Sequence, residues 1–403
     1  MTHALTGFLM RRSLLSALAT LVSLLHAPAF AEEAAGQTSL EAPDVEVVFG
    51  QSAALTGPAS ELGMGMRLGL ESAFAEVNAH GGIDGRRLSL VSLDDMYEPE
   101  AAVANTRELI EVHDVYALVG AVGTPTSRAA QPVTSEAGVP YIAPFTGAEF
   151  LREARKQSNV VNVRASYFQE TAEIVARLTE DLGITKIGIL YQDDSYGRAG
   201  LAGVRRALDA HGLPLVVEAN YPRNTEIVKR AVLDLRRFDP EAVVIIGAYK
   251  PAATLIRWAR KVDFKPVFVN ISFVGTSALA EELGADGEGV YITQVVPFPG
   301  DTRVPVVDRY QKALAATAPD AQPGFVSLEG YLAGRLVADG MRLAGPGVSR
   351  AKFLEALRSA PPIDLGGFEL EYGEEDNQGS DRVYLTVIDA NGEVRPAQRM
   401  VGR

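Results

Sequence analysis

The chain has 403 residues, of which 47% are hydrophobic and 22% charged, with a net charge of −13 and no cysteine. This length predicts two or three folded domains and excludes a small disulfide-stapled scaffold. The negative charge argues against nucleic acid or an anionic membrane as a general partner. Without cysteine the chain has no thiolate metal site, no cysteine nucleophile and no lipid anchor on cysteine, so it is not expected to be a lipoprotein.

The first 31 residues are organised like a cleavable secretory signal peptide. Arg11 and Arg12 precede an uncharged run at 13–27, and Ala29-Phe30-Ala31 offers a cleavage site. The run is shorter than the roughly 20 residues that a membrane-spanning helix needs. We therefore expect a signal peptide at 1–31 and export to the periplasm. A start at Met10, and export by the general or the twin-arginine route, both stay open.

After a leader at 32–43 that we expect to be disordered, β-branched runs alternate with helical patterns. The first series predicts, in order, strand 45–49, a helix ending near 78, strand 87–93, helix 99–112, strand 116–119, helix 127–137 and strand 140–143. The second predicts strand 186–191, helix 197–211, strand 213–219, helix 226–238, strand 242–246, helix 251–262, strand 266–270 and helix 277–283. Trp258 is expected in the core, on one apolar stripe with Leu255 and Val262. Continuous apolar strands favour parallel sheets that helices cover on both faces.

The later chain breaks this alternation. It predicts strand 290–296, helices 305–316, 325–343 and 349–359, and strands 368–372 and 382–389. Such a segment is typical of a chain returning to domains already built. The predicted fold class is α/β, with two doubly wound parallel-sheet lobes.

Motifs for catalysis, metals and cofactors are missing from the predicted mature chain. Its histidines, His80, His113 and His211, are far apart, and no G-x-S-x-G elbow or P-loop occurs. The glycines of 63–69 fall within a predicted helix instead of the turn that a dinucleotide site requires, so we interpret them as close helix packing. We expect no enzyme, no metal and no cofactor.

Turns after predicted strands carry the candidate ligand-binding residues. Thr124 and Thr146 follow two neighbouring strands of the first half, where ligands of open α/β sheets bind. Helix capping and ligand binding explain these threonines equally well. In the second half the corresponding turns carry Tyr196, Tyr249 and the pair Ser272-Phe273, which are suited to cover an apolar or planar solute.

Several short motifs in order resemble the type I periplasmic solute-binding proteins of ABC importers, in the leucine/isoleucine/valine-binding (branched-chain amino acid) family. They are Leu55-Thr56-Gly57-Pro58, Asn78-Ala79-His80-Gly81-Gly82-Ile83-Asp84-Gly85, Asp94-Asp95, Gly138-Val139-Pro140, Asp194-Ser195-Tyr196-Gly197 and Gly330-Tyr331. The resemblance implies two lobes joined by three crossover strands, placed here at 161–166, 293–298 and 366–372. The N-terminal lobe is then 44–163 with 297–368, and the C-terminal lobe 164–296 with 369–403.

By position, the resemblance assigns carboxylate binding to Thr124, a further contact to Thr146 and aromatic contacts to Tyr196 and Tyr249. Phe273 and Tyr167 complete the candidate ligand site. Two positions depart from the family: Leu62 stands for a bulky aromatic, and Ser272 for the acid that pairs with a ligand ammonium.

Glu61 or Glu329 could replace that acid, or both are solvated helix residues. A buried ammonium without a carboxylate partner costs several kcal/mol, which puts a standard α-amino acid in doubt. The implied function is capture of an amino acid or a related amide or carboxylate by hinge closure, for an inner-membrane permease. A ligand sensor on the same fold is the alternative. We expect a monomer.

Overall fold

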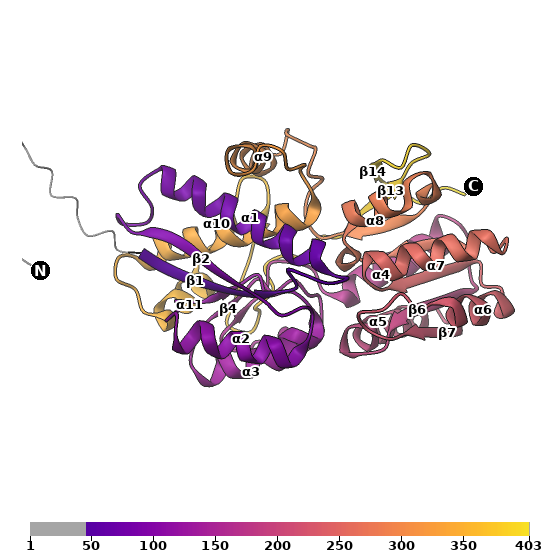
Figure 1. The fold of residues 1–403 in the computed structure, drawn as a ribbon, viewed down its shortest axis with the longest axis horizontal. Coiled ribbons are helices and arrows are strands. Elements are labelled where there is room, and N and C mark those ends of the chain that lie inside the picture. The colour runs from indigo at the N-terminus through magenta and orange to yellow at the C-terminus, as the bar shows by residue number, and fades with distance from the viewer. Residues whose placement is uncertain (1–45, 403) are drawn as a thin grey trace, which may run out of the picture. The chain divides into compact units, whose positions relative to one another are not determined.

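Two β-sheets organise residues 46–402, which are the residues that this computed structural model describes (Figure 1). The predicted signal peptide at 1–31 and leader at 32–43 lie outside the described residues. Each sheet carries helices on both faces, so the chain forms two α/β lobes. The predicted fold class is confirmed.

The first lobe is built on a five-stranded sheet in the order β2-β1-β3-β4-β5, with every pair parallel. Helices α1, α9, α10 and α11 pack together, and α2 and α3 form a second layer. The strands are β1 Glu46–Ala53, β2 Arg87–Asp94, β3 Leu118–Val119, β4 Tyr141–Ile142 and β5 Val160–Val161. The helices are α1 Ser60–Ala79, α2 Pro99–Glu111, α3 Thr124–Glu136, α9 Pro305–Thr317, α10 Phe325–Ala344 and α11 Arg350–Ser359.

The second lobe is built on a seven-stranded sheet in the order β14-β13-β10-β9-β8-β6-β7. It is parallel from β7 to β10, and the hairpin β13-β14 adds an antiparallel edge. The strands are β6 Ile187–Gln192, β7 Leu215–Tyr221, β8 Ala242–Ile246, β9 Val267–Asn270, β10 Tyr291–Gln294, β13 Tyr384–Ile388 and β14 Val394–Ala397. The helices are α4 Tyr167–Glu180, α5 Ser195–Ala210, α6 Lys229–Phe238, α7 Tyr249–Lys261 and α8 Thr276–Leu283.

Most predicted elements lie within a few residues of the observed ones, but helix α4 has no counterpart in the prediction. Its start is fixed by a capping box, in which Ser166 accepts from the backbone of Gln169 and the side chain of Gln169 accepts from the backbone of Ser166. This Ser-x-x-Gln pattern is visible in the sequence and predicts a helix start. The omission matters because α4 carries Tyr167 and Glu170.

Three stretches of chain pass between the sheets. The first follows β5 and leads into α4, and the second follows β10 and leads to α9. The segment 366–372, expected as the third crossover, contributes instead to a small antiparallel sheet of β11 Ile363–Asp364 and β12 Glu369–Leu370. The chain then runs beside Asn162, whose backbone bonds to Asn377 and Gly379, before it enters β13.

Helices α1 and α10 approach to backbone contact, as the glycines of 63–69 predict. A Cβ at Gly69 would lie 2.0 Å from the carbonyl oxygen of Ser327, and one at Gly330 would lie 2.3 Å from that of Met66. Only glycine permits this approach, so the packing interpretation is confirmed over a dinucleotide turn.

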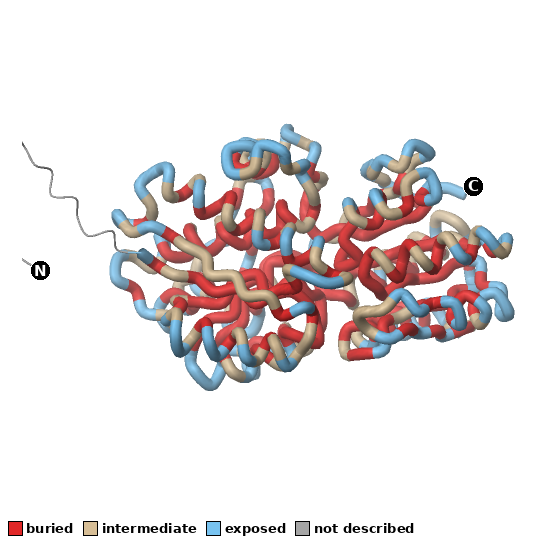
Figure 2. Tube along the Cα trace, viewed as in Figure 1, coloured by how far each residue is buried: buried red, intermediate tan, exposed pale blue. Residues whose placement is uncertain are grey.

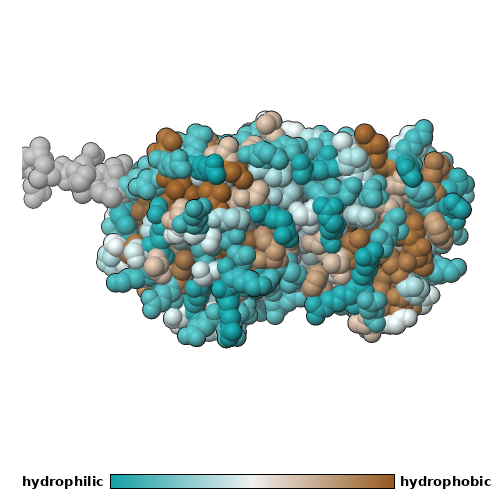
Figure 3. Space-filling view, turned by 90° about the horizontal axis from the view of Figure 1, so that it is seen from below, coloured by the Kyte–Doolittle hydropathy of each residue, from teal (hydrophilic) through white to brown (hydrophobic). Residues whose placement is uncertain are grey.

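The central strands of both sheets are buried, the edge strands β2, β7 and β14 are only partly buried, and the outer helix faces are exposed (Figure 2). The face in Figure 3 is mostly hydrophilic, with separate hydrophobic patches. Trp258, expected in the core, is instead 38% exposed on α7, where Lys229 and Lys261 flank its ring. That expectation is wrong because the apolar stripe of α7 turns Leu255 inward and leaves Trp258 at its edge.

Candidate functional site

Two buried threonines of the first lobe meet where their turns leave the sheet. Thr124 begins α3 and Thr146 follows β4, and their hydroxyl oxygens are 2.7 Å apart. The N-cap of α3 is Gly123, at φ 107°, and makes no side-chain cap bond. Thr124 therefore does not cap the helix, and its hydroxyl is directed to other side chains.

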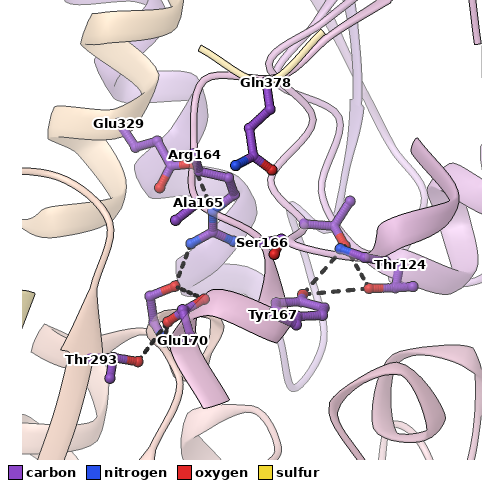
Figure 4. A network of polar contacts seen from close by, with 12 residues as sticks. Thr124, Arg164, Ala165, Ser166, Tyr167, Glu170, Thr293, Glu329 and Gln378 are labelled. Carbon is purple, nitrogen blue, oxygen red and sulfur yellow. Dashed lines mark hydrogen bonds and ion pairs between the residues drawn. The ribbon is translucent and has the colours of Figure 1, made fainter. Parts of the chain in front are cut away.

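The hydroxyl of Tyr167, the first residue of α4, completes a polar triad. It lies 3.4 Å from the Thr124 hydroxyl and 3.3 Å from that of Thr146 (Figure 4). Burial raises the pKa of Tyr167, so the phenol stays protonated and can donate. The triad joins a helix start of the first lobe to the chain entering the second.

Five aromatic rings, here called the ring cluster, contact one another beside this triad and share Tyr167 with it; they are Tyr97, Phe145, Tyr167, Tyr196 and Phe273. Ring centroids are 4.5 Å apart for Tyr196–Phe273, 5.4 Å for Phe145–Phe273 and 5.6 Å for Tyr167–Tyr196. Tyr97 lies 6.2 Å from Phe273. Since Tyr97 and Phe145 belong to the first lobe and Phe273 to the second, the ring cluster joins the two lobes.

Ser272 is held by a buried glutamate that sequence reasoning missed. Glu170 on α4 accepts from the Ser272 backbone N–H at 2.7 Å and from its hydroxyl at 3.0 Å, and also from the hydroxyl of Thr293 at 2.6 Å. Ser272, which stands where the resemblance places an acid, therefore lies against the acid Glu170. Figure 4 shows Glu170 beside Thr293. Three donors satisfy that carboxylate within the protein.

Arg164, in the first crossover, is the largest charged side chain buried in this region. Its Nε is 3.1 Å from Oε1 of Glu329, its guanidinium bonds the Ser272 hydroxyl, and its Cζ lies 4.5 Å from the Phe145 ring centroid. Burial raises the pKa of Glu329 to about 7, against the opposing charge of Arg164. Glu329 is thus a buried ion-pair partner and not a solvated helix residue, whereas Glu61 is exposed.

Leu62 and Tyr249 meet at Gly275, which follows β9. A Cβ at Gly275 would lie 2.6 Å from a Leu62 methyl and 3.7 Å from the Tyr249 ring. Leu62 shares one hydrophobic cluster with the five rings, whereas Tyr249 packs mainly into the separate core under α6–α8. Leu62 and Gly275 also line a pocket of about 420 Å³ to which both lobes contribute.

Of the predicted site residues, Thr124, Thr146, Tyr167, Tyr196, Ser272 and Phe273 form one connected set, Leu62 adjoins it, and Tyr249 lies at its margin. Arg164, Glu170 and Tyr97 were missed. Arg164 is the one charged residue in the run Val160-Val161-Asn162-Val163-Arg164-Ala165, and this is the sequence signal that marks it.

A strained turn carries Tyr97 and Glu98 toward the second lobe. Met96 and Tyr97 have positive φ values of 51° and 63°, and their N–H groups are held at 2.9 Å by the carboxylates of Asp94 and Asp95. The motif Asp94-Asp95 thus has a structural role, because its two carboxylates accept hydrogen bonds that compensate the backbone strain of the turn.

Glu98, next in the chain, bridges to the second lobe. Its carboxylate bonds Arg223 and accepts from Asn224 at 2.6 Å. We expect Glu98→Gln to weaken solute affinity about two- to fivefold, since part-exposed pairs contribute up to about 1 kcal/mol. Calorimetry checks this against Glu218→Gln, which breaks the Arg205 pair inside the second lobe and should leave affinity unchanged. Equal effects of the two variants would contradict the bridging role.

Burial raises the pKa of Asp95 to about 6, above its usual 3.8, although Ser52 and the Tyr97 N–H oppose the shift. Because this pKa is higher in the folded state, the native protein binds more protons than the unfolded chain between about pH 4 and 6. Protonated Asp95 therefore contributes to the free energy of unfolding below pH 4, and that contribution is lost as the pH rises through 6. We expect Asp95→Asn to remove about 1–3 kcal/mol of that decline. Denaturant unfolding at several pH values measures it, with exposed Glu180→Gln as control. A wild-type slope that persists in Asp95→Asn would refute the assignment.

Within residues 46–402 no group of three or more histidine, aspartate or glutamate side chains is arranged to hold a metal ion. Over the same residues no helix is both long and apolar enough to cross a membrane.

Comparison with known proteins gives the family. The family model described as periplasmic binding protein matches residues 46–393. The Leu/Ile/Val-binding protein homolog 7 of Brucella abortus is 26% identical over 353 residues, which cover 84% of this chain and 87% of that one.

Two solved structures share both sequence and fold with this chain. A possible leucine/isoleucine/valine-binding protein from Rhodopirellula baltica is 38% identical with a TM-score of 0.83, over 88% of this chain and 96% of that one. A substrate-binding periplasmic protein from Ralstonia solanacearum is 32% identical with a TM-score of 0.82, over 87% of this chain and 100% of that one. The chain therefore belongs to the periplasmic binding protein family, with the type I fold and a similarity to its Leu/Ile/Val-binding members, and is a solute-binding protein rather than an enzyme.

Proposed function

We propose that the protein is the periplasmic solute-binding component of an ABC importer, which captures a small organic solute between its lobes and presents it to inner-membrane permease subunits. The observation that carries the proposal is the convergence of the Thr124 and Thr146 hydroxyls with Tyr167 and the ring cluster, from both lobes. A solute that contacts both walls only when the lobes are shut shifts the hinge equilibrium toward closure.

The chemistry of these walls limits the solute. Hydroxyl donors suit a carboxylate or an amide oxygen, and the rings suit an apolar or planar body. The proposed class is accordingly an amino acid or a related amide or carboxylate.

The test is a solute screen with the mature chain, by thermal shift and then calorimetry, with small-angle scattering to follow lobe closure. The expected result is one class of solute that raises the melting temperature, compacts the protein and is recovered unchanged. A bound solute that leaves the scattering curve unaltered, or that is converted to product, contradicts capture by closure. The importer assignment is tested separately by reconstituting the cognate ABC permease in vesicles and measuring whether this protein stimulates its ATP hydrolysis.

Thr124→Val removes one hydroxyl and keeps the volume of the side chain. We expect solute affinity to fall about 10- to 100-fold, the range for losing a hydrogen bond to a buried polar or charged group. Thr171→Val is the matched control, because its buried hydroxyl donates only to the backbone of its own helix. An unchanged affinity in Thr124→Val, measured by calorimetry, would remove this residue from the site.

A further inference from the structure

The buried acids beside the ring cluster are already engaged. In residues 46–402 the buried acids are Asp95, Glu170, Asp194 and Glu329. Asp95 and Glu170 are bonded as described, and Asp194 accepts from the backbone N–H of Tyr196 at 2.9 Å and of Gly197 at 3.2 Å, and from Gln192 at 2.6 Å. Glu329 pairs with Arg164. A solute ammonium would therefore compete for carboxylates that are already partnered.

Among the charged side chains that contact the ring cluster, Arg164 is the one with unmet hydrogen-bonding capacity in the described residues. Arg164 is 1% exposed, and neither its Nη1 nor its Nε makes a hydrogen bond of good geometry with the described residues. The contact of Nε with Glu329 at 3.1 Å is thus an ion pair without an aligned hydrogen bond. A buried guanidinium presents five donors in a plane that matches a carboxylate, and an unsatisfied one is costly.

Arg164 also lies within reach of the proposed solute walls. Its guanidinium covers Phe145, which directly precedes Thr146 and packs against Phe273. Its partner Ser272 directly precedes Phe273. The cation thus lies against the ring cluster, and its contacts Phe145 and Ser272 directly precede Thr146 and Phe273 in the chain.

We infer that the interlobe site takes a carboxylate with a planar or apolar body and no ammonium group, and that Arg164 is the residue that selects the anion. This rests on the proposed function. The hydroxyls of Thr124 and Thr146 bind the carboxylate together with Arg164, and the rings cover the body of the solute. The free N–H of Arg164 gains an acceptor, whereas an α-amino acid would add a buried ammonium beside the four buried carboxylates, which already have partners.

The test compares matched solutes that differ by one group on the wild-type protein. The pairs are 3-phenylpropanoate with phenylalanine, 4-methylpentanoate with leucine, and benzoate with benzamide. We expect calorimetry to give at least one acid that binds about tenfold or more tightly than its partner, about 1.4 kcal/mol. An amino acid or amide that equals or exceeds its acid overturns the inference, as does binding of none of the acids.

Variants test the role of Arg164 itself. Arg164→Gln should bring the benzoate-to-benzamide ratio close to one, and Arg164→Lys, which keeps the charge, should retain part of the preference. Arg128→Gln is the matched control, since Arg128 lies over Phe150 at the surface and should leave the ratio unchanged. A preserved ratio in folded Arg164→Gln overturns the assignment. If that variant does not fold, a ratio in Arg164→Lys equal to wild type, with Arg128→Gln also unchanged, overturns it.

Failure of this inference is distinguishable from failure of the proposed function. If a solute of another class binds and closes the lobes, the proposal of capture by closure is supported and only the inference of an ammonium-free carboxylate is refuted. Conversion of the solute, or binding without closure, removes the proposed function.

Discussion

Gly69→Ala is expected to destabilise the first lobe by about 3 kcal/mol or more, at the upper end for overpacking. The new methyl would lie 2.0 Å from the carbonyl oxygen of Ser327 and 2.6 Å from the backbone nitrogen of Tyr331. Both atoms belong to the backbone of α10, so no side chain can yield. The clash exceeds the roughly 1 kcal/mol that alanine gains over glycine in a helix.

Gly65→Ala in the same helix is the control. Its methyl would lie 3.1 Å from a methyl and 3.2 Å from the Cβ of Val326, and 3.8 Å from the backbone nitrogen of Ser327, a far milder contact than the one at Gly69. Guanidinium unfolding should therefore give a stability within about 1 kcal/mol of wild type, because the helix gain offsets the contact. Similar losses in both variants would show that α1 and α10 do not depend on backbone contact.

Phe273→Ala is expected to weaken solute affinity about 100-fold or more. Its ring contacts Tyr97 and Phe145 of the first lobe and Tyr196 of the second. Deleting a buried phenylalanine ring costs about 3–5 kcal/mol, and because this ring lies where the lobes meet, much of that loss falls on closure.

The surface variant Phe238→Ala separates this effect from the general loss of a phenylalanine. Phe238 is 56% exposed at the end of α6. Its replacement should leave calorimetric affinity unchanged. Affinity in Phe273→Ala within about threefold of wild type would mean that the ring packs for stability alone.

Sequence patterns predict the structural features that are determined by residues close together in the chain. The spacing of Leu62, Met66 and Leu70 predicts α1, because apolar side chains at that interval form one buried helix face. The meeting of the Thr124 and Thr146 turns is predictable because the carboxyl ends of neighbouring parallel strands lie at one edge of the sheet. Both inferences use a few consecutive residues.

The missed part of the site depends on pairs far apart in sequence. Arg164 meets Glu329, and Glu170 meets Ser272 and Thr293, through the fold alone. A glutamate on a helix is usually solvated, so nothing local marks Glu329 as buried. Glu170 was overlooked for a simpler reason, because its helix was not predicted although the Ser166 capping pattern was present.

Trp258, the chain's single tryptophan, lies on the outer surface of α7 between two lysines, whereas the rings at the lobe contact are tyrosine and phenylalanine. Tryptophan fluorescence will accordingly report the local environment of that helix and will not change when a solute binds between the lobes. Tyrosine difference absorbance will respond to occupancy instead. The molecule thus carries its own optical reference, and a titration read by both signals separates solute capture from unfolding without any attached dye.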